Sequence, residues 1–114
     1  MLQNEPLIIT DEGRKVTLSF NQSYPKNPNQ RAITGFTDDG ELWACYTVYI
    51  EAAFFESDRE TIIDTNGAPH IVDVLVEAGI IKDTDKRVQS GYCTYPIVRL
   101  TDKALAAVEQ VEIE

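Results

Sequence analysis

The sequence lacks most of the features that mark a cofactor-binding or catalytic protein. It contains one histidine and two cysteines, Cys45 and Cys93, whose separation suits neither a CxxC redox pair nor a zinc-binding spacing. Its six glycines form neither a GxGxxG nor a GxxxxGK[ST] phosphate-binding loop. We therefore expect no cofactor and no metal, and the absences favour a protein that is not an enzyme.

Long hydrophobic runs are also missing. No stretch approaches the roughly 20 apolar residues that are needed to cross a bilayer. The first residues lack the basic segment and long apolar core of a secretory signal. The sequence therefore predicts a cytoplasmic protein without a membrane partner, in which both cysteines are reduced packing residues.

Positive charge is scarce: 10 basic residues face 19 acidic ones, which gives a net charge of −9. Binding to nucleic acid depends on Lys and Arg, so we expect no DNA or RNA partner. A basic protein surface is a more natural partner, although a role in solubility also explains the charge. The length of 114 residues fits a single domain over 1–114, with less order at 1–13 and 112–114.

Two-residue alternation predicts the first strands. Residues 14–21 alternate between apolar and polar, and residues 31–51 contain two strand-like runs around the turn sequence TDDG. One face of the second run carries Leu42, Ala44, Tyr46, Val48 and Ile50, and the other carries Trp43, Cys45, Thr47 and Tyr49. Residues 52–59 stay open between a helical turn and a bulged connection.

The second half of the chain contains the helical signals. A short strand at TIIDT is followed by a helix that has Asn66 as a possible cap, Pro69 at its first position and Gly79 at its end. After the polar loop KDTDKR, VQSGYCTYPIVRL resembles a strand that Gly91 and Pro96 interrupt; the proline indicates an edge or bulge. Thr101 caps a last amphipathic helix. The prediction is α+β: a mainly antiparallel sheet of four to five strands with two helices packed on one face.

His70 is the residue that most invites a catalytic interpretation. It shares one polar stripe of the predicted helix with Asp73 and Glu77, a pattern typical of a solvated face. A hydrolase would need His70 in contact with a nucleophile such as Cys93 and with a third, orienting group. A metal site would need about three converging ligands. We assign no catalytic residue here and keep the pair His70 and Cys93 as an alternative.

Aromatic residues gather on the predicted strands. Trp43, Tyr49, Tyr92 and Tyr95 either fill the core beneath the helices or form an interaction surface, because each ring combines apolar area with a polar tip.

Three segments, 41–51, 60–69 and 77–100, resemble a small bacterial family of unknown function. The resemblance rests on turn, cap and bulge positions: Asp64, Thr65, Asn66, Gly79, Ile80, Ser90, Gly91, Tyr95 and Pro96. It implies that the protein is encoded on a conjugative or related mobile element. No catalytic residues are established for such proteins, so none is carried over.

The leading hypothesis is a non-enzymatic accessory or protein-interaction protein of a bacterial mobile element, which binds a protein partner or itself. One alternative is an acidic inhibitor that imitates nucleic acid in the basic groove of a defence nuclease, which requires a continuous band of carboxylates. The other is a cysteine/histidine-dependent hydrolase, which requires contact between His70 and Cys93.

Overall fold

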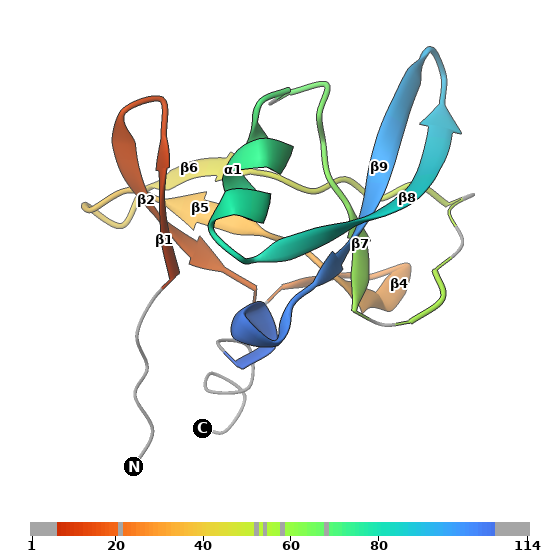
Figure 1. Ribbon diagram of the computed structural model, residues 1–114, viewed down its shortest axis with the longest axis horizontal. Helices are drawn as coiled ribbons and strands as arrows, with labels where there is room; N and C mark the ends of the chain where they lie inside the picture. Colours follow the sequence, from red (N-terminus) through yellow and green to blue (C-terminus); the bar gives the residue numbers. More distant parts are fainter. Residues whose placement is uncertain are drawn as a thin grey trace.

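The structure is a computed structural model that describes residues 7–20, 22–51, 53, 55–57, 59–67 and 69–106, and at residues 28 and 29 only the backbone. Within these residues the chain forms short strands and one helix, α1 (Ile71–Glu77), followed by a helical segment at 102–106 (Figure 1). The strands are β1 (Leu7–Asp11), β2 (Arg14–Ser19), β3 (Ser23–Tyr24), β4 (Asn27–Arg31), β5 (Thr34–Phe36), β6 (Leu42–Cys45), β7 (Glu60–Ile62), β8 (Ile81–Ser90) and β9 (Cys93–Leu100). None of the described helices is long and apolar enough to cross a membrane.

The strands are distributed over three sheets. Their orders are β1-β2-β5-β6, β3-β4 and β7-β9-β8, and all of these strand pairs are antiparallel. The prediction of a mainly antiparallel α+β protein is therefore confirmed. The prediction of one sheet of four to five strands is wrong, because the chain leaves the first sheet after β6. An isolated bridge between Thr47 and Ile63 then connects the residues after β6 to the end of β7 in the three-stranded sheet.

β1 forms in a region for which the sequence predicted less order. A two-residue turn, Glu12–Gly13, joins it to β2, so that Asp11 pairs with Arg14. Both turn residues have positive φ, 53° and 80°, as the tight turns of hairpins require. Asp11 thereby comes to lie at the very end of an edge strand. Residues 1–6 and 112–114 of the predicted less ordered ends lie outside the described residues.

The turn of the β5–β6 hairpin was predicted correctly. The assignment of β6 side chains to a buried and an exposed face was not. Gly40 has φ 83°, and its N–H donates to the carbonyl of Thr37. The register then shifts between Gly35 and Phe36, which interrupts the alternation along β6. Leu42 is 64% exposed although Tyr46, which was expected on the same face, is buried.

The loop predicted at KDTDKR is part of β8, and this corrects the sequence analysis. β8 runs through these residues with a bulge between Asp83 and Lys86, and a turn at Gly91 (φ 62°) leads into β9. The segment VQSGYCTYPIVRL is thus two strands of a hairpin. Pro96 lies on the central strand of its sheet, one residue before Ile97, which pairs with the end of β7. Its carbonyl accepts a hydrogen bond from the N–H of Ile63, and the pairing with β7 ends at this point, where proline has no N–H to donate.

The helical ends also differ in detail from the prediction. His70, not Asn66 or Pro69, precedes the first residue of α1, and it makes no side-chain cap hydrogen bond. Gly79 follows the helix with φ 79°, as predicted. Thr101 caps the segment 102–106, because its hydroxyl accepts a hydrogen bond from the N–H of Ala104 at 3.3 Å. In the open segment 52–59, the described residues belong to neither a helix nor a strand.

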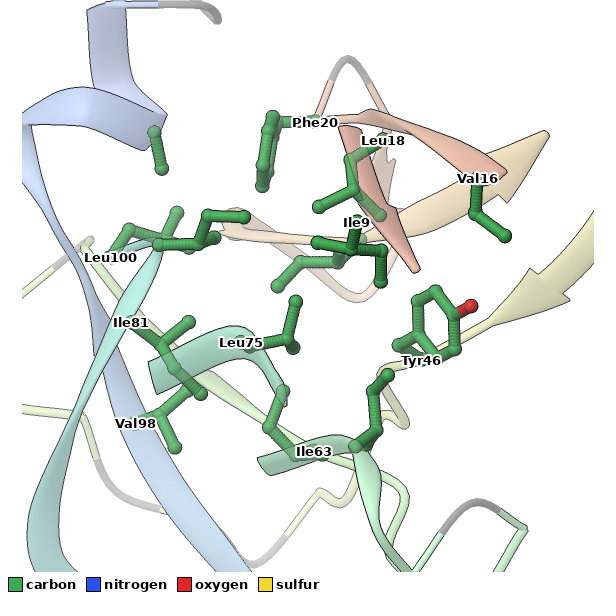
Figure 2. Packing of buried hydrophobic residues seen from close by; sticks show 14 residues of the cluster. Ile9, Val16, Leu18, Phe20, Tyr46, Ile63, Leu75, Ile81, Val98 and Leu100 are labelled. Carbon is green, nitrogen blue, oxygen red and sulfur yellow. The ribbon is translucent and has the colours of Figure 1, made fainter. Parts of the chain in front are cut away.

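One hydrophobic core joins α1 to the four-stranded and three-stranded sheets. Leu75 of α1 lies among apolar side chains from both sheets, Ile9, Leu18, Ile81, Val98 and Leu100 (Figure 2). Tyr46 lies at one end of this cluster, and its ring passes close to Gly35. A Cβ atom at residue 35 would lie 3.0 Å from Cε2 of Tyr46. Glycine at this position lets the tyrosine ring cross β5.

Candidate functional site

A buried carboxylate, Asp11, is the centre of the most elaborate polar cluster among the described residues. Its Oδ2 accepts hydrogen bonds from the hydroxyl of Tyr46 at 2.6 Å and from Nε1 of Trp43 at 3.0 Å. Its Oδ1 lies 2.6 Å from Nε2 of His70. We call these four residues, Asp11, Trp43, Tyr46 and His70, the Asp11 cluster.

The fold explains why residues so distant in sequence meet. β1 and β6 are the two outer strands of the four-stranded sheet, so the sheet must curl strongly for side chains of one edge to reach the other. Asp11 ends β1, Trp43 belongs to β6, and Tyr46 follows β6 directly. His70 enters from the residue before α1, which packs against β1. The cluster therefore links both edges of the sheet to the helix.

The hydrogen bonds keep Asp11 ionised despite its burial. Burial alone would raise the pKa of the Asp11 carboxyl, but hydrogen bonds from Tyr46, His70 and Trp43, together with the charge of His70, lower it overall. The pKa of the Tyr46 phenol is raised by burial and by its hydrogen bond to the carboxylate. Tyr46 therefore stays protonated and acts as a donor.

The contact with Asp11 also shifts the pKa of His70, in the opposite direction to that of Asp11. The hydrogen bond to Asp11 raises the pKa of the imidazole, and burial opposes this shift only in part. The side chain is 43% exposed, so water reaches the ring while Asp11 fixes one of its nitrogens. The sequence analysis placed His70 on a solvated stripe and missed this partner.

Opposite pKa shifts predict a window of greatest stability. The pKa of Asp11 is below its ordinary value of 3.8, so its contribution is present above that value and is lost as the pH falls through the folded-state pKa. The pKa of His70 is above 6.5, so its contribution is complete below pH 6.5 and is lost as the pH rises through the folded-state pKa. Stability should therefore peak between these two values.

Urea unfolding at a series of pH values, with EDTA present, measures this window. On the alkaline side we expect a loss of about 0.5–1 kcal/mol, discounted for solvent screening of the partly exposed imidazole. The variant His70→Gln should lose this dependence above pH 6.5 and keep the decline on the acidic side. An unchanged alkaline decline in His70→Gln would assign the effect to another group.

The Asp11 cluster contains two of the groups that a histidine-dependent active site needs, an imidazole and a carboxylate that orients it. A carboxylate that orients an exposed imidazole is typical of general bases, but a nucleophile must lie within hydrogen-bond reach. Among the described residues, no hydrogen bond joins His70 to Cys93. Cys93 instead lies beside Tyr95, whose pKa its hydrogen bond raises. His70 therefore contacts Asp11, whereas Cys93 lies at the start of β9 beside Tyr95.

The four aromatic residues of the predicted interaction surface have different surroundings. Tyr92 is fully exposed in the turn between β8 and β9, at the tip of a hairpin that projects from the body (Figure 1). Tyr49 lies against Tyr24, with ring centroids 5.8 Å apart. Trp43 belongs to the Asp11 cluster, and Tyr95 is half-buried.

A second buried carboxylate, Glu60, forms ion pairs that connect neighbouring strands. It lies 2.9 Å from Nζ of Lys86 and 3.7 Å from Arg99, and an open pocket with acidic and basic walls surrounds it. Burial raises the pKa of Glu60, but Lys86, the N–H of Glu56 and Arg99 lower it overall. The ionised carboxylate therefore fastens β7 to β8 and β9.

Several carboxylates form ion pairs with cationic side chains. Asp11 and Glu60 are buried, and Asp83 and Asp102 pair with Arg87 and Arg59. These four groups do not extend a free row of negative charge, so they lend no support to the imitation of nucleic acid.

The outer strands of the sheets differ in how they are protected. β8 carries five charged side chains and a bulge, which are usual defences against pairing with another chain. β6 has the sequence LWAC, without charge, and it pairs with β5 along one edge. No described strand pairs with its other edge.

The chain was compared with known protein families, curated proteins and solved structures. No family model, no curated protein and no solved structure matches the chain. The resemblance to a mobile-element family therefore stays a prediction, and function has to be argued from the geometry. Sequence reasoning missed Asp11 and the polar role of Tyr46, and the only available signal was a carboxylate that ends a short apolar run.

Proposed function

We propose that this protein is a non-enzymatic accessory domain that binds a partner protein by pairing β6 with an extended, basic segment of the partner. The observation that carries the proposal is the uncharged sequence of the outer strand β6, in contrast to the outer strand β8 of the other sheet, which is charged and bulged. Edge strands without such protection are templates for strand addition.

The backbone of β6 offers hydrogen-bonding groups to such a segment. The N–H of Tyr46 donates to the carbonyl of Ile33, on the side of β5. Because consecutive residues of a strand direct their amides to opposite edges, the N–H of Cys45 is directed to the open edge. Main-chain hydrogen bonds there would supply affinity without a requirement for one sequence.

The side chains of β6 offer apolar area next to this edge. Leu42 is 64% exposed, and Trp43 is half-buried with the Arg14 guanidinium 5.3 Å from its ring. An aromatic ring held in place by its own hydrogen bond is the kind of anchor that dominates protein interfaces. The bond from Trp43 to Asp11 provides that fixation.

Charge favours a basic partner over a second copy of this chain. Asp38, Asp39 and Glu41 are exposed immediately before β6, and the net charge is −9. A basic segment is attracted by this end of the strand, whereas a second copy carries the same repulsive charge. The resemblance to a mobile-element family supports a role as an accessory protein within this proposal.

Peptide display on the folded protein tests the proposal. We expect selected peptides to be rich in β-branched residues and in Lys or Arg. Fluorescence anisotropy with one such peptide should show that Leu42→Lys weakens binding at least about tenfold, since a lysine on an edge strand opposes pairing with another chain and repels a basic segment. Methylation of alternate backbone amides of the peptide should weaken binding in the same way.

The matched control is Ile8→Lys, which changes a half-exposed side chain on the opposite outer strand. It should leave peptide binding unchanged. The proposal fails if Leu42→Lys and backbone methylation both leave affinity intact, or if the wild-type protein forms a β6-dependent dimer that excludes the peptide.

A further inference from the structure

The geometry points to a binding site for a divalent transition-metal ion, of the Zn²⁺ type, formed by Asp11, Glu12 and His70. Among the described residues, these three side chains form a group in which one donor atom from each lies within 4.8 Å of the others. The site goes beyond the proposed strand-binding function and does not depend on it.

The ligand separations are within reach of a bound ion. Zn²⁺ takes His nitrogen and carboxylate oxygen at about 2.0–2.2 Å, so its ligand atoms lie up to about 4 Å apart. Oδ1 of Asp11 and Nε2 of His70 are 2.6 Å apart, less than the about 3.4 Å between ligands of a tetrahedral ion, so the exposed imidazole moves slightly outward when the ion enters. Glu12 is exposed, so a rotamer change brings its carboxylate closer. The ion would replace the proton that Asp11 and His70 now share.

Asp11 is prepared as a ligand by its neighbours. Trp43 and Tyr46 both donate to Oδ2, which leaves Oδ1 directed at His70. Carboxylates that bind metals are commonly oriented by such outer hydrogen bonds. The Asp11 side chain is only 5% exposed, so its position is fixed before an ion arrives. The structure therefore supplies one rigid, one oriented and one adjustable ligand.

The donor set selects the class of ion. One imidazole nitrogen and two carboxylate oxygens suit Zn²⁺ or Mn²⁺ better than Ca²⁺, which takes six to eight oxygen ligands. Three protein ligands leave a position for water or for a donor from another molecule. Trp43 belongs both to the support of Asp11 and to β6, so an ion here would stiffen the proposed binding edge.

Calorimetric titration of the EDTA-stripped, dialysed protein with ZnCl₂ tests the site. We expect one ion per chain, release of protons at neutral pH and a higher Tm in the presence of zinc. Glu12→Gln and His70→Gln should each weaken binding at least about tenfold, because even the loss of an outer hydrogen bond costs 10–100-fold. Tyr46→Phe, which removes such a bond, should weaken binding about tenfold.

Two controls separate this site from other zinc ligands. Asp73→Asn removes an exposed carboxylate of α1 outside the group and should bind zinc like the wild type. The double variant Cys45→Ser, Cys93→Ser should also bind unchanged. Glu12 is an exposed residue in the turn after β1, so Glu12→Gln is informative even where His70→Gln reduces stability. The inference is overturned if zinc does not bind, if Glu12→Gln binds as tightly as the wild type, or if the cysteine variant abolishes binding.

Discussion

Asp11→Ala is expected to lower the free energy of unfolding by about 3–4 kcal/mol. The substitution removes the acceptor of the Tyr46 hydroxyl and the Trp43 indole N–H, and each buried donor left unpaired costs about 1–3 kcal/mol. It also removes the charged partner of His70. Urea unfolding followed by circular dichroism at pH 6 measures the change.

Two companion variants make the Asp11 prediction specific. Asp11→Asn keeps one oxygen acceptor without the charge, so we expect a loss of about half that of Asp11→Ala. Glu12→Gln, at the neighbouring exposed position, should stay within about 0.5 kcal/mol of the wild type. Equal stability of Asp11→Ala and Glu12→Gln would show that the Asp11 cluster does not hold the sheet edges together.

Gly35→Ala is expected to lower the free energy of unfolding by about 2–3 kcal/mol, because the added methyl group overpacks the core. The new Cβ would lie 2.5 Å from Cγ1 of Val16 and 3.0 Å from Cε2 of Tyr46, and both side chains are buried. Relief of either contact requires movement of β2 or of the ring that reaches Asp11. Urea unfolding again measures the change.

A double-mutant cycle provides the control for Gly35. In the background of Val16→Ala the closest contact disappears, so Gly35→Ala should destabilise by at least about 1 kcal/mol less than in the wild type. Strict additivity of the two substitutions would contradict the proposed clash. It would then attribute the effect to backbone entropy at a strand glycine instead.

The parts of the fold that could be predicted depend on local chemistry. The Asp-Gly turn before β6, the end of α1 at Gly79 and the cap at Thr101 each follow from residues that are adjacent in sequence. Residues 82–87 of β8 were taken for a loop because an outer strand protected by charge has the composition of a loop. The chain passes from the four-stranded sheet to the three-stranded sheet through long-range contacts, among them the bridge between Thr47 and Ile63, and no local pattern encodes these contacts.

The candidate site was harder to predict than the fold. His70 was assigned to a solvated stripe because its helical neighbours are polar, whereas its partner Asp11 lies 59 residues earlier. The alternation along β6 assigned Trp43 and Tyr46 to opposite faces, but both reach the same carboxylate oxygen. The register shift in β6 and the curl of the sheet cause this convergence, and both depend on tertiary contacts.

Trp43 is the only tryptophan in the chain, and its indole N–H is bonded to the central carboxylate of the Asp11 cluster. Tryptophan emission from this protein therefore originates from one ring, which lies between the Asp11 carboxylate and the Arg14 guanidinium. Any event that alters that carboxylate or occupies the adjoining strand edge alters the environment of the fluorophore. The fluorescence of Trp43 can therefore report binding at this site without an added label.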